Sequence, residues 1–186
     1  MVRAFLDLEG SSLGRHSFPV EVAWVFEDGA EESHLIRPAP RWKEWQAGQS
    51  LHQIPSDVLE IDGSPVEDVA RRLVDVLSGH EVYADAPAWD GDWLDILLRS
   101  AELSAGALQL VDIDAGLEEL ASAILAPSLP SSEIPRATRR ILADASARFA
   151  GRPRARRALA DARLSRERWL AASALARAYR AEGGVP

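Results

Sequence analysis

The sequence predicts an α/β fold in which helices flank a mixed sheet, and two observations indicate it. Apolar or β-branched runs come first along the chain, at residues 2–8, 19–26 and 33–37, and tight turns separate them. From residue 66 onward, helical periodicity alternates with short apolar runs. Strands joined by tight turns form an antiparallel meander, whereas strands that alternate with helices pair in parallel. Both kinds of pairing are therefore expected in one sheet.

The meander is indicated by strand patterning and by a turn. Residues 19–26, PVEVAWVF, alternate through Val20, Val22 and Trp24. The tetrapeptide EDGA at residues 27–30 is a hairpin signal that leads into the third strand.

The rest of the chain predicts alternating helices and strands. Ser64 at a cap, Pro65 at the first helical position and Glu67 three residues after the cap indicate a helix that continues to Gly79. The whole order is β-β-β-α-β-α-β-α-α-α. The later elements are a strand at 81–84, a helix at 90–98, a strand at 108–113 and helices at 115–125, 136–149 and 156–179.

Composition restricts the class of protein. The chain has 186 residues, 47% hydrophobic and 27% charged, so we expect residues 1–186 to form a single globular domain. The absence of cysteine excludes disulfides and thiolate metal sites. No apolar run approaches the roughly 20 residues that span a bilayer. Asp7 comes too early for a signal peptide. A cytoplasmic protein without membrane contact is expected.

Basic residues concentrate in the last third of the chain. Residues 136–168 contain eleven arginines and three acidic residues, whereas the whole chain has a net charge of −8, so the remainder carries −16. An acidic body beside a basic segment suggests a polyanion-binding face next to a carboxylate-rich centre. The alternative is an arginine-rich helix surface exposed to solvent.

Asp7 and Glu9 stand two residues apart at the end of the first expected strand. Strand side chains alternate between faces, so both carboxylates project from the same side, close enough to share a hard cation such as Mg²⁺. Gly10, Ser11 and Ser12 follow, and we expect their backbone amides to contact a ligand where the strand ends. Surface strands often carry such acidic pairs, so this pair does not identify a site on its own.

Two later aspartates stand where chemistry is also expected. Asp90 follows a strand and a proline-containing turn, and the alternative for it is a helix N-cap. Asp161 lies in an Ala- and Leu-rich helical stretch among arginines. The alternative for Asp161 is an ion pair with Arg157, four residues earlier.

An acidic pair on the first strand, an aspartate after a middle strand and an aspartate in a late helix follow one another along the chain. Taken in this order, the three segments resemble the three motifs of the DEDD superfamily of 3′–5′ exonucleases, which have a ribonuclease-H-like fold. The segment His52-Gln53-Ile54, followed by a cap and a helix, is similar to the family's His-x-Ile segment between the first two motifs. The resemblance runs from Asp7 to Asp161 with the same order of elements. The matching segments are FLDLEGSS (5–12), YADAPAWDGDWL (83–94) and RALADAR (157–163).

The resemblance implies a metal site with four carboxylate ligands. Two Mg²⁺ or Mn²⁺ ions would lie about 4 Å apart and flank the scissile phosphodiester, activating the attacking water and stabilising the departing 3′ oxygen. Asp7 would bridge the two ions. Glu9 and Asp161 would complete the shell of one ion, and Asp90 would serve the other.

The implied substrate is the 3′ end of RNA or single-stranded DNA. Trp89, Leu13 or His52 would stack on or wedge the terminal nucleotide, because stacking on a base tolerates any sequence. A core position is the alternative for Trp89 and Leu13. Ser11 and Ser12, through their amides, and Arg157 are the other residues expected to bind substrate.

The chain departs from the family's pattern at the general base. The DEDDh branch has a histidine five residues before the last aspartate, where this chain has Arg156. The DEDDy branch has a tyrosine four residues before it, where this chain has Arg157. A guanidinium stays protonated near neutral pH, so it cannot accept a proton from water, although it can bind phosphate. Losing a general base typically lowers a rate by about 10²–10⁴-fold. His52 is the best candidate for a substitute, since His80 should lie at the opposite end of the sheet.

Two functions therefore stay open. One is a metal-dependent 3′–5′ exonuclease weakened by the loss of its general base. The other is a catalytically inactive protein that uses the same fold to bind nucleic acid or a protein partner. A haloacid-dehalogenase-type phosphatase is set aside, because Glu9 stands where that class needs a second aspartate. Members of the DEDD superfamily are often dimers, so a homodimer is also an expectation.

Overall fold

The structure is a computed structural model that describes residues 2–14, 16–42, 53–152 and 156–182. Within these residues, five strands form one mixed sheet in the order β3-β2-β1-β4-β5, which confirms the predicted class. The strands are β1 (Arg3–Gly10), β2 (Pro19–Phe26), β3 (Glu31–Leu35), β4 (Glu81–Ala84) and β5 (Leu110–Asp112).

Pairing in the sheet changes from antiparallel to parallel at β1. β1 pairs antiparallel with β2, and β2 pairs antiparallel with β3, which gives the expected meander. β1 pairs in parallel with β4, and β4 pairs in parallel with β5. The carboxyl ends of β1 and β4 therefore lie at the same edge of the sheet, and side chains that follow these two strands meet there.

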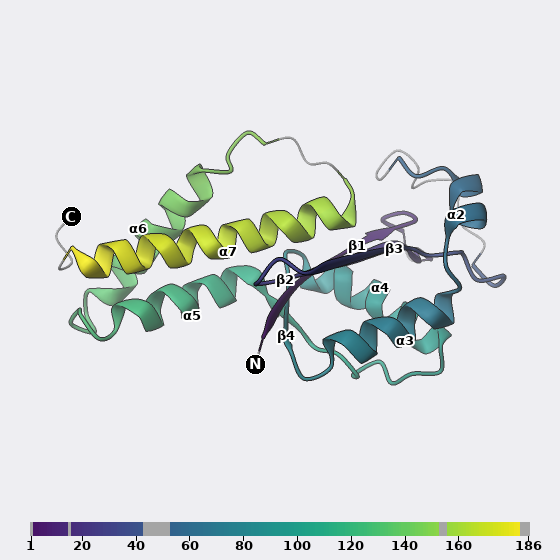
Figure 1. Ribbon diagram of the computed structural model, residues 1–186, viewed down its shortest axis with the longest axis horizontal. Helices are drawn as coiled ribbons and strands as arrows, with labels where there is room; N and C mark the ends of the chain where they lie inside the picture. Colours follow the sequence, from purple (N-terminus) through teal and green to yellow (C-terminus); the bar gives the residue numbers. More distant parts are fainter. Residues whose placement is uncertain (1, 15, 43–52, 153–155, 183–186) are drawn as a thin grey trace.

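Helices cover both faces of the sheet (Figure 1). α3 and α4 pack on one face, against Ala4, Leu6 and Leu8 of β1. α5 and α7 pack on the other face, against Phe5 and Tyr83, and α6 packs against α5 and α7. No helix of the described segments is both long enough and apolar enough to cross a bilayer. The helices are α2 (Ser56–Asp62), α3 (Val66–Leu77), α4 (Pro87–Ser100), α5 (Ile113–Leu125), α6 (Ile134–Ala147) and α7 (Ala158–Ala181).

The start of α3 differs from the sequence-based expectation, and α2 is an additional element. α3 begins at Val66, with Pro65 at its N-cap and no side-chain cap, so the prediction of Ser64 as the cap is wrong. The backbone of Ser64 bonds to the end of the meander instead. Its N–H donates to the carbonyl of Leu35, and its carbonyl accepts from the N–H of Arg37, both at 2.9 Å.

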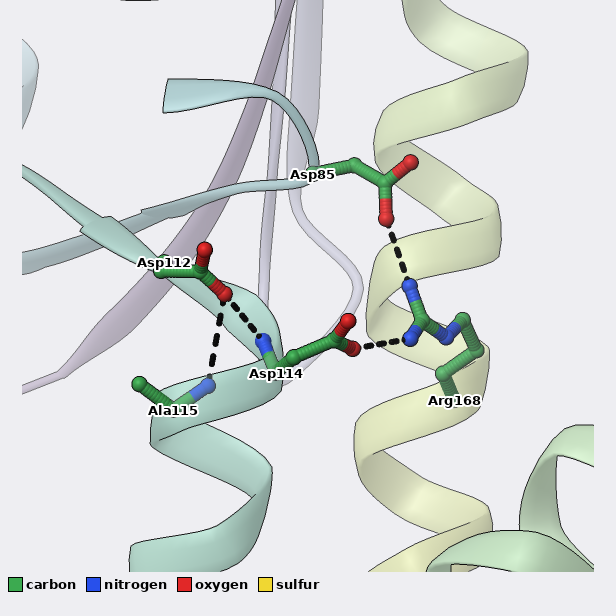
Figure 2. A network of polar contacts seen from close by, with 5 residues as sticks. All are labelled: Asp85, Asp112, Asp114, Ala115 and Arg168. Carbon is green, nitrogen blue, oxygen red and sulfur yellow. Dashed lines mark hydrogen bonds and ion pairs between the residues drawn. The ribbon is translucent and has the colours of Figure 1, made fainter. Parts of the chain in front are cut away.

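α4 and α5 both begin earlier than the sequence pattern indicates. α5 begins at Ile113, because Asp112 Oδ1 accepts hydrogen bonds from the N–H groups of Asp114 at 2.7 Å and Ala115 at 3.3 Å (Figure 2). This cap also ends β5 at Asp112. α4 has Pro87 in its first turn, where the missing N–H has no helical partner to lose.

Candidate metal centre

Strand β1 carries two of the expected carboxylates to one face of the sheet. Leu6 and Leu8 point into the core formed with α3 and α4. Asp7 and Glu9 alternate with them, so they point to the opposite face, which α7 crosses in contact with β1 and β2 (Figure 1). The prediction that these two side chains share one side of the strand is confirmed, since they offer oxygens to one cluster.

Asp161 completes a group of three carboxylates. It lies in the first turn of α7. Asp7, Glu9 and Asp161 each offer one oxygen such that all three atoms lie within 4.8 Å of one another, and the three side chains are half-buried. Oxygen atoms of this kind and spacing suit the hard cations Mg²⁺ and Mn²⁺.

Asp90 reaches the same pocket from α4. Its side chain is only 2% exposed, and its Oδ1 accepts a hydrogen bond from the N–H of Leu8 at 3.1 Å. Its Oδ2 is buried and has no hydrogen-bond donor among the described residues. The N-cap alternative for Asp90 is wrong, because Ala86 is the N-cap of α4. A buried carboxylate oxygen without a donor is a group that a bound cation would satisfy.

Burial and mutual repulsion raise the pKa values of these carboxyl groups. Burial raises the pKa of Asp7 well above its ordinary range, and the charges of Asp90, Asp161 and Glu9 raise it further. Burial and the charge of Asp161 raise the pKa of Glu9 from 4.5 to about 7. Burial also raises the pKa of Asp90 from 3.8 to about 7, against the effect of the backbone hydrogen bonds that it accepts. A divalent cation would reverse this penalty, because it favours the ionised forms.

The four carboxylates line one pocket of about 340 Å³. Leu13 and Trp89 line it as well and are 58% and 45% exposed, so the alternative of core positions for these two residues is wrong. Together with Trp93 they also line a second pocket of about 420 Å³, which therefore adjoins the first. An exposed aromatic and an exposed apolar side chain beside an acidic pocket are suited to stack on a base.

Trp93 holds the loop that carries Leu13. The indole ring packs so closely on Gly10 that a Cβ there would lie 2.1 Å from it. Its Nε1–H donates to the hydroxyl of Ser17 at 2.9 Å, and this hydroxyl donates to the carbonyl of Ser12 at 2.6 Å. The loop is thus fixed by contacts with α4.

The backbone amides of Ser11 and Ser12 are not free as expected, because both have partners within the loop, and a role of these residues in substrate binding stays a prediction. The N–H of Ser11 donates to the carbonyl of Phe18 at 2.8 Å, and the N–H of Ser12 donates to the hydroxyl of Ser17 at 3.1 Å. Both serines are buried. The loop folds back on itself, and buried N–H groups must find partners within it.

Two arginines precede Asp161 and occupy different environments. Arg156 is exposed and lines the carboxylate pocket. Its φ of 50° lies in the left-handed region, which residues other than glycine rarely adopt. Arg157 bonds bidentately to Glu21, with Nη2 donating to Oε1 at 2.8 Å and Nε donating to Oε2 at 3.0 Å. That Arg157 binds substrate stays a prediction.

Much of the basic segment is engaged by the chain's own acceptors. Arg166 of α7 donates to the carbonyl of Glu27 at 3.0 Å, and other arginines among the described residues of this segment form ion pairs. These contacts hold α7 on the acidic body, so the charge pattern gives less support to a polyanion-binding face than the sequence suggested. These ion pairs include Arg152–Glu167, Arg157–Glu21, Arg163–Glu31 and Arg168 with both Asp85 and Asp114.

Arg168 joins α7 to the ends of β4 and β5 (Figure 2). Its guanidinium donates to Asp85, which follows β4, at 2.6 Å, and it also pairs with Asp114 in the first turn of α5. The charge of Asp85 contributes to the raised pKa values of Asp7 and Asp90. Arg168 therefore places a positive charge beside a carboxylate that adds to the repulsion in the pocket.

Of the described histidines, none lines the carboxylate pocket. His80 Nδ1 lies 3.2 Å from the carbonyl of Val2, at the opposite end of β1, as predicted. His34 stacks on Trp24 with ring centroids 5.2 Å apart. His52 lies outside the described residues, so its roles as a substitute base and as a substrate contact stay predictions.

Glu21 is a candidate functional residue that the sequence pattern did not single out. Its side chain is 1% exposed, in a strand whose other residues are almost all buried. The signal that marks it is a carboxylate inside the apolar run PVEVAWVF, because a buried acid is retained almost only with a partner. That partner, Arg157, is 136 positions away, so inspection of the local sequence does not reveal it.

No protein-family model matches this sequence, and no curated protein does. Solved structures nevertheless match the fold. Exonuclease I from E. coli, in a zinc-bound complex with single-stranded DNA, has a TM-score of 0.62 and 15% identity over 97% of this chain. Exonuclease I from Methylocaldum szegediense has a TM-score of 0.62 and 15% identity over 91%. A 3′-exonuclease that recognises the 3′ end of histone mRNA stem-loops has a TM-score of 0.62 and 14% identity over 95%.

These matches define the class of fold. The chain shares the ribonuclease-H-like fold of these exonuclease structures, with a mixed five-stranded sheet between helices. It spans 40% of the length of each of these exonuclease I chains and 65% of the 3′-exonuclease chain. At 14–15% identity the likeness shows the fold alone.

Proposed function

We propose that this protein is a divalent-metal-dependent 3′–5′ exonuclease that hydrolyses phosphodiester bonds at the 3′ end of RNA or single-stranded DNA. The observation that carries the proposal is the convergence of carboxylates from three elements. Asp7 and Glu9 come from β1, Asp161 comes from α7, and Asp90 of α4 adds a buried oxygen for which the described part of the chain offers no donor. The solved structures that share the fold include exonucleases bound to single-stranded DNA and to an RNA stem-loop.

The donor set fits Mg²⁺ or Mn²⁺. All four groups offer oxygen, and the chain contains no cysteine that would favour a softer metal. By analogy with the DEDD motifs, Asp7 would contact two ions, Glu9 and Asp161 would hold one, and Asp90 would hold the other. Bound ions of this kind would activate water and stabilise the charge that develops on the leaving oxygen.

The chain's own residues then account for substrate binding and for a reduced rate. Leu13 and Trp89 would stack against the terminal base at the rim of the pocket. Arg156 would stand at the family's general-base position and bind the phosphate without accepting a proton from water. We expect a rate about 10²–10⁴-fold below that of a site with a histidine base.

The test is hydrolysis of 5′-labelled single-stranded RNA and DNA in the presence of Mn²⁺. The wild type should shorten the strands stepwise from the 3′ end. Asp7→Asn should abolish shortening, and Arg156→His should accelerate it. Asp144→Asn, on the exposed surface of α6, is the matched control and should leave the rate unchanged.

The outcomes separate the two functions that the sequence left open. No shortening by the wild type, with activity gained in Arg156→His, would identify an inactive protein that retains the scaffold of the site. No activity in either protein, together with no Mn²⁺ binding, would refute the metal site. Sedimentation of the same samples would test the expected homodimer.

A further inference from the structure

Helix α7 lacks a cap of its own, although it carries one of the carboxylates of the metal centre. Its N-cap residue, Arg157, is extended and makes no side-chain cap to the helix. Asp161 follows within the first turn. The position of this carboxylate relative to Asp7 and Glu9 therefore depends on what holds the first turn of α7 against the sheet.

Glu21 of β2 holds the first turn of α7 against the sheet. Its Oε2 accepts from the backbone N–H of Ala158, the first residue of α7, at 3.1 Å. The same oxygen accepts from Nε of Arg157 at 3.0 Å, and Oε1 accepts from Nη2 at 2.8 Å. Both oxygens of a carboxylate that is 1% exposed are thus used at the start of one helix. A negative charge at this end is also favoured by the helix dipole.

The contacts of Glu21 with Arg157 and with the N–H of Ala158, called here the Glu21–Arg157 bracket, lie next to the metal centre. In the register of the sheet, Glu21 lies directly opposite Glu9, so their side chains share the face that α7 covers. Ala158 and Asp161 are three residues apart, which places them on neighbouring positions of the same helical turn. Glu21 is therefore on the strand next to Glu9, and Ala158, which it binds, is within one helical turn of Asp161.

We propose that Glu21 and Arg157 are positioning residues that set the first turn of α7, and with it the Asp161 carboxylate, at the distance from Asp7 and Glu9 that a divalent cation requires. The inference rests on the proposed metal site, since it assigns the residues that hold one of its ligands. Residues that orient metal ligands typically change metal affinity or activity by about 10–100-fold when they are replaced.

The experiment measures the dissociation constant of Mn²⁺ by calorimetry on the EDTA-treated protein, residues 1–186. Glu21→Gln has nearly the same shape but loses the charge, and it should weaken Mn²⁺ binding by about 10–100-fold. Arg157→Gln should weaken it in the same direction. Circular dichroism and thermal melting of each variant show whether it is folded.

The matched control is Glu31→Gln. Glu31 pairs bidentately with Arg163, which lies further along the same helix, but it is not part of the pocket. If the bracket acts through Asp161, Glu31→Gln should keep the Mn²⁺ dissociation constant within about twofold of the wild type, as expected for an exposed pair. Equal weakening in Glu31→Gln would overturn the inference, because any loosening of α7 would then suffice.

A folded Glu21→Gln variant with wild-type Mn²⁺ affinity would also overturn the inference that Glu21 and Arg157 position Asp161. If Glu21→Gln does not fold, Arg157→Gln decides, since the Arg157 side chain is 51% exposed and the buried Glu21 carboxylate keeps the N–H of Ala158 as a donor. Failure of the proposed function gives a different result. A wild type that binds Mn²⁺ without cleaving nucleic acid would refute the exonuclease while leaving the bracket standing.

Discussion

Replacing Asp90 by asparagine should stabilise the metal-free protein above neutral pH. The pKa of Asp90 is about 7 in the folded protein and 3.8 ordinarily. Between these values the folded state keeps a proton that the unfolded chain has lost, so stability falls as pH rises. Each pKa unit of this difference corresponds to about 1.36 kcal/mol. The ionised Asp90 should therefore lower the free energy of unfolding by about 4 kcal/mol at pH 8, and by less if water enters the pocket.

Asparagine removes the ionisable group and retains an oxygen that can accept from the N–H of Leu8. The advantage of Asp90→Asn over the wild type should therefore shrink by about 2–3 kcal/mol between pH 8 and pH 5. Urea unfolding in EDTA at the two pH values measures it. Asp92, two residues along the same helix and exposed, provides the control. Asp92→Asn should change the free energy of unfolding by less than about 0.5 kcal/mol at either pH.

A clear result would contradict this reasoning. If Asp90→Asn destabilised the metal-free protein equally at pH 5 and pH 8, Asp90 would not be a buried charge that opposes folding. Adding Mn²⁺ should reverse the order of stability, because the cation favours the ionised carboxylates of the wild type.

Three further predictions concern the metal, the substrate and the packing of the site. Mn²⁺ at 100 times its dissociation constant should stabilise the wild type by about 2.7 kcal/mol in thermal melts. A comparable gain in Asp7→Asn would contradict the site. Trp89→Ala and Leu13→Ala should leave the melting temperature nearly unchanged, and the loss of base stacking in Trp89→Ala should weaken oligonucleotide binding by about 1–3 kcal/mol in fluorescence titrations. Gly10→Ala should lower the free energy of unfolding by about 1–3 kcal/mol in urea melts, because its Cβ would overlap the indole ring of Trp93. A Cβ at Gly91 in α4 has no atom of the described residues within 4 Å, so Gly91→Ala should raise the free energy of unfolding by about 0.5–1 kcal/mol. Equal effects at the two glycines would refute the close packing.

The local part of the site could be predicted from residue spacing. Asp7 and Glu9 are two positions apart on a strand, and the alternation of strand side chains places them on one face regardless of the rest of the fold. The meander followed from the turn signal and from apolar runs of strand length. The position of His80 at the far end of the sheet followed from the order of the elements alone.

Loop contacts could not be predicted in this way. Ser11 and Ser12 stand at a strand end, where free amides are usual, but the loop folds back and uses both amides internally. Leu13 and Trp89 have apolar side chains that could equally have been buried, and only the tertiary structure places them, exposed, at the rim of the pocket.

Periodicity and turn chemistry were enough to predict the strands, most helices and the shared face of Asp7 and Glu9, because these depend on neighbours within a few residues. The order of these elements and of the acidic segments along the chain indicated the class of fold. Contacts across long stretches of chain depend on which helix covers which face of the sheet. The meeting of Asp161 and Asp90 with β1, and the pairing of Arg157 with Glu21, arise only when α7 and α4 pack on opposite faces of the same strand. A change in that packing would leave every local pattern intact and would still separate the four carboxylates.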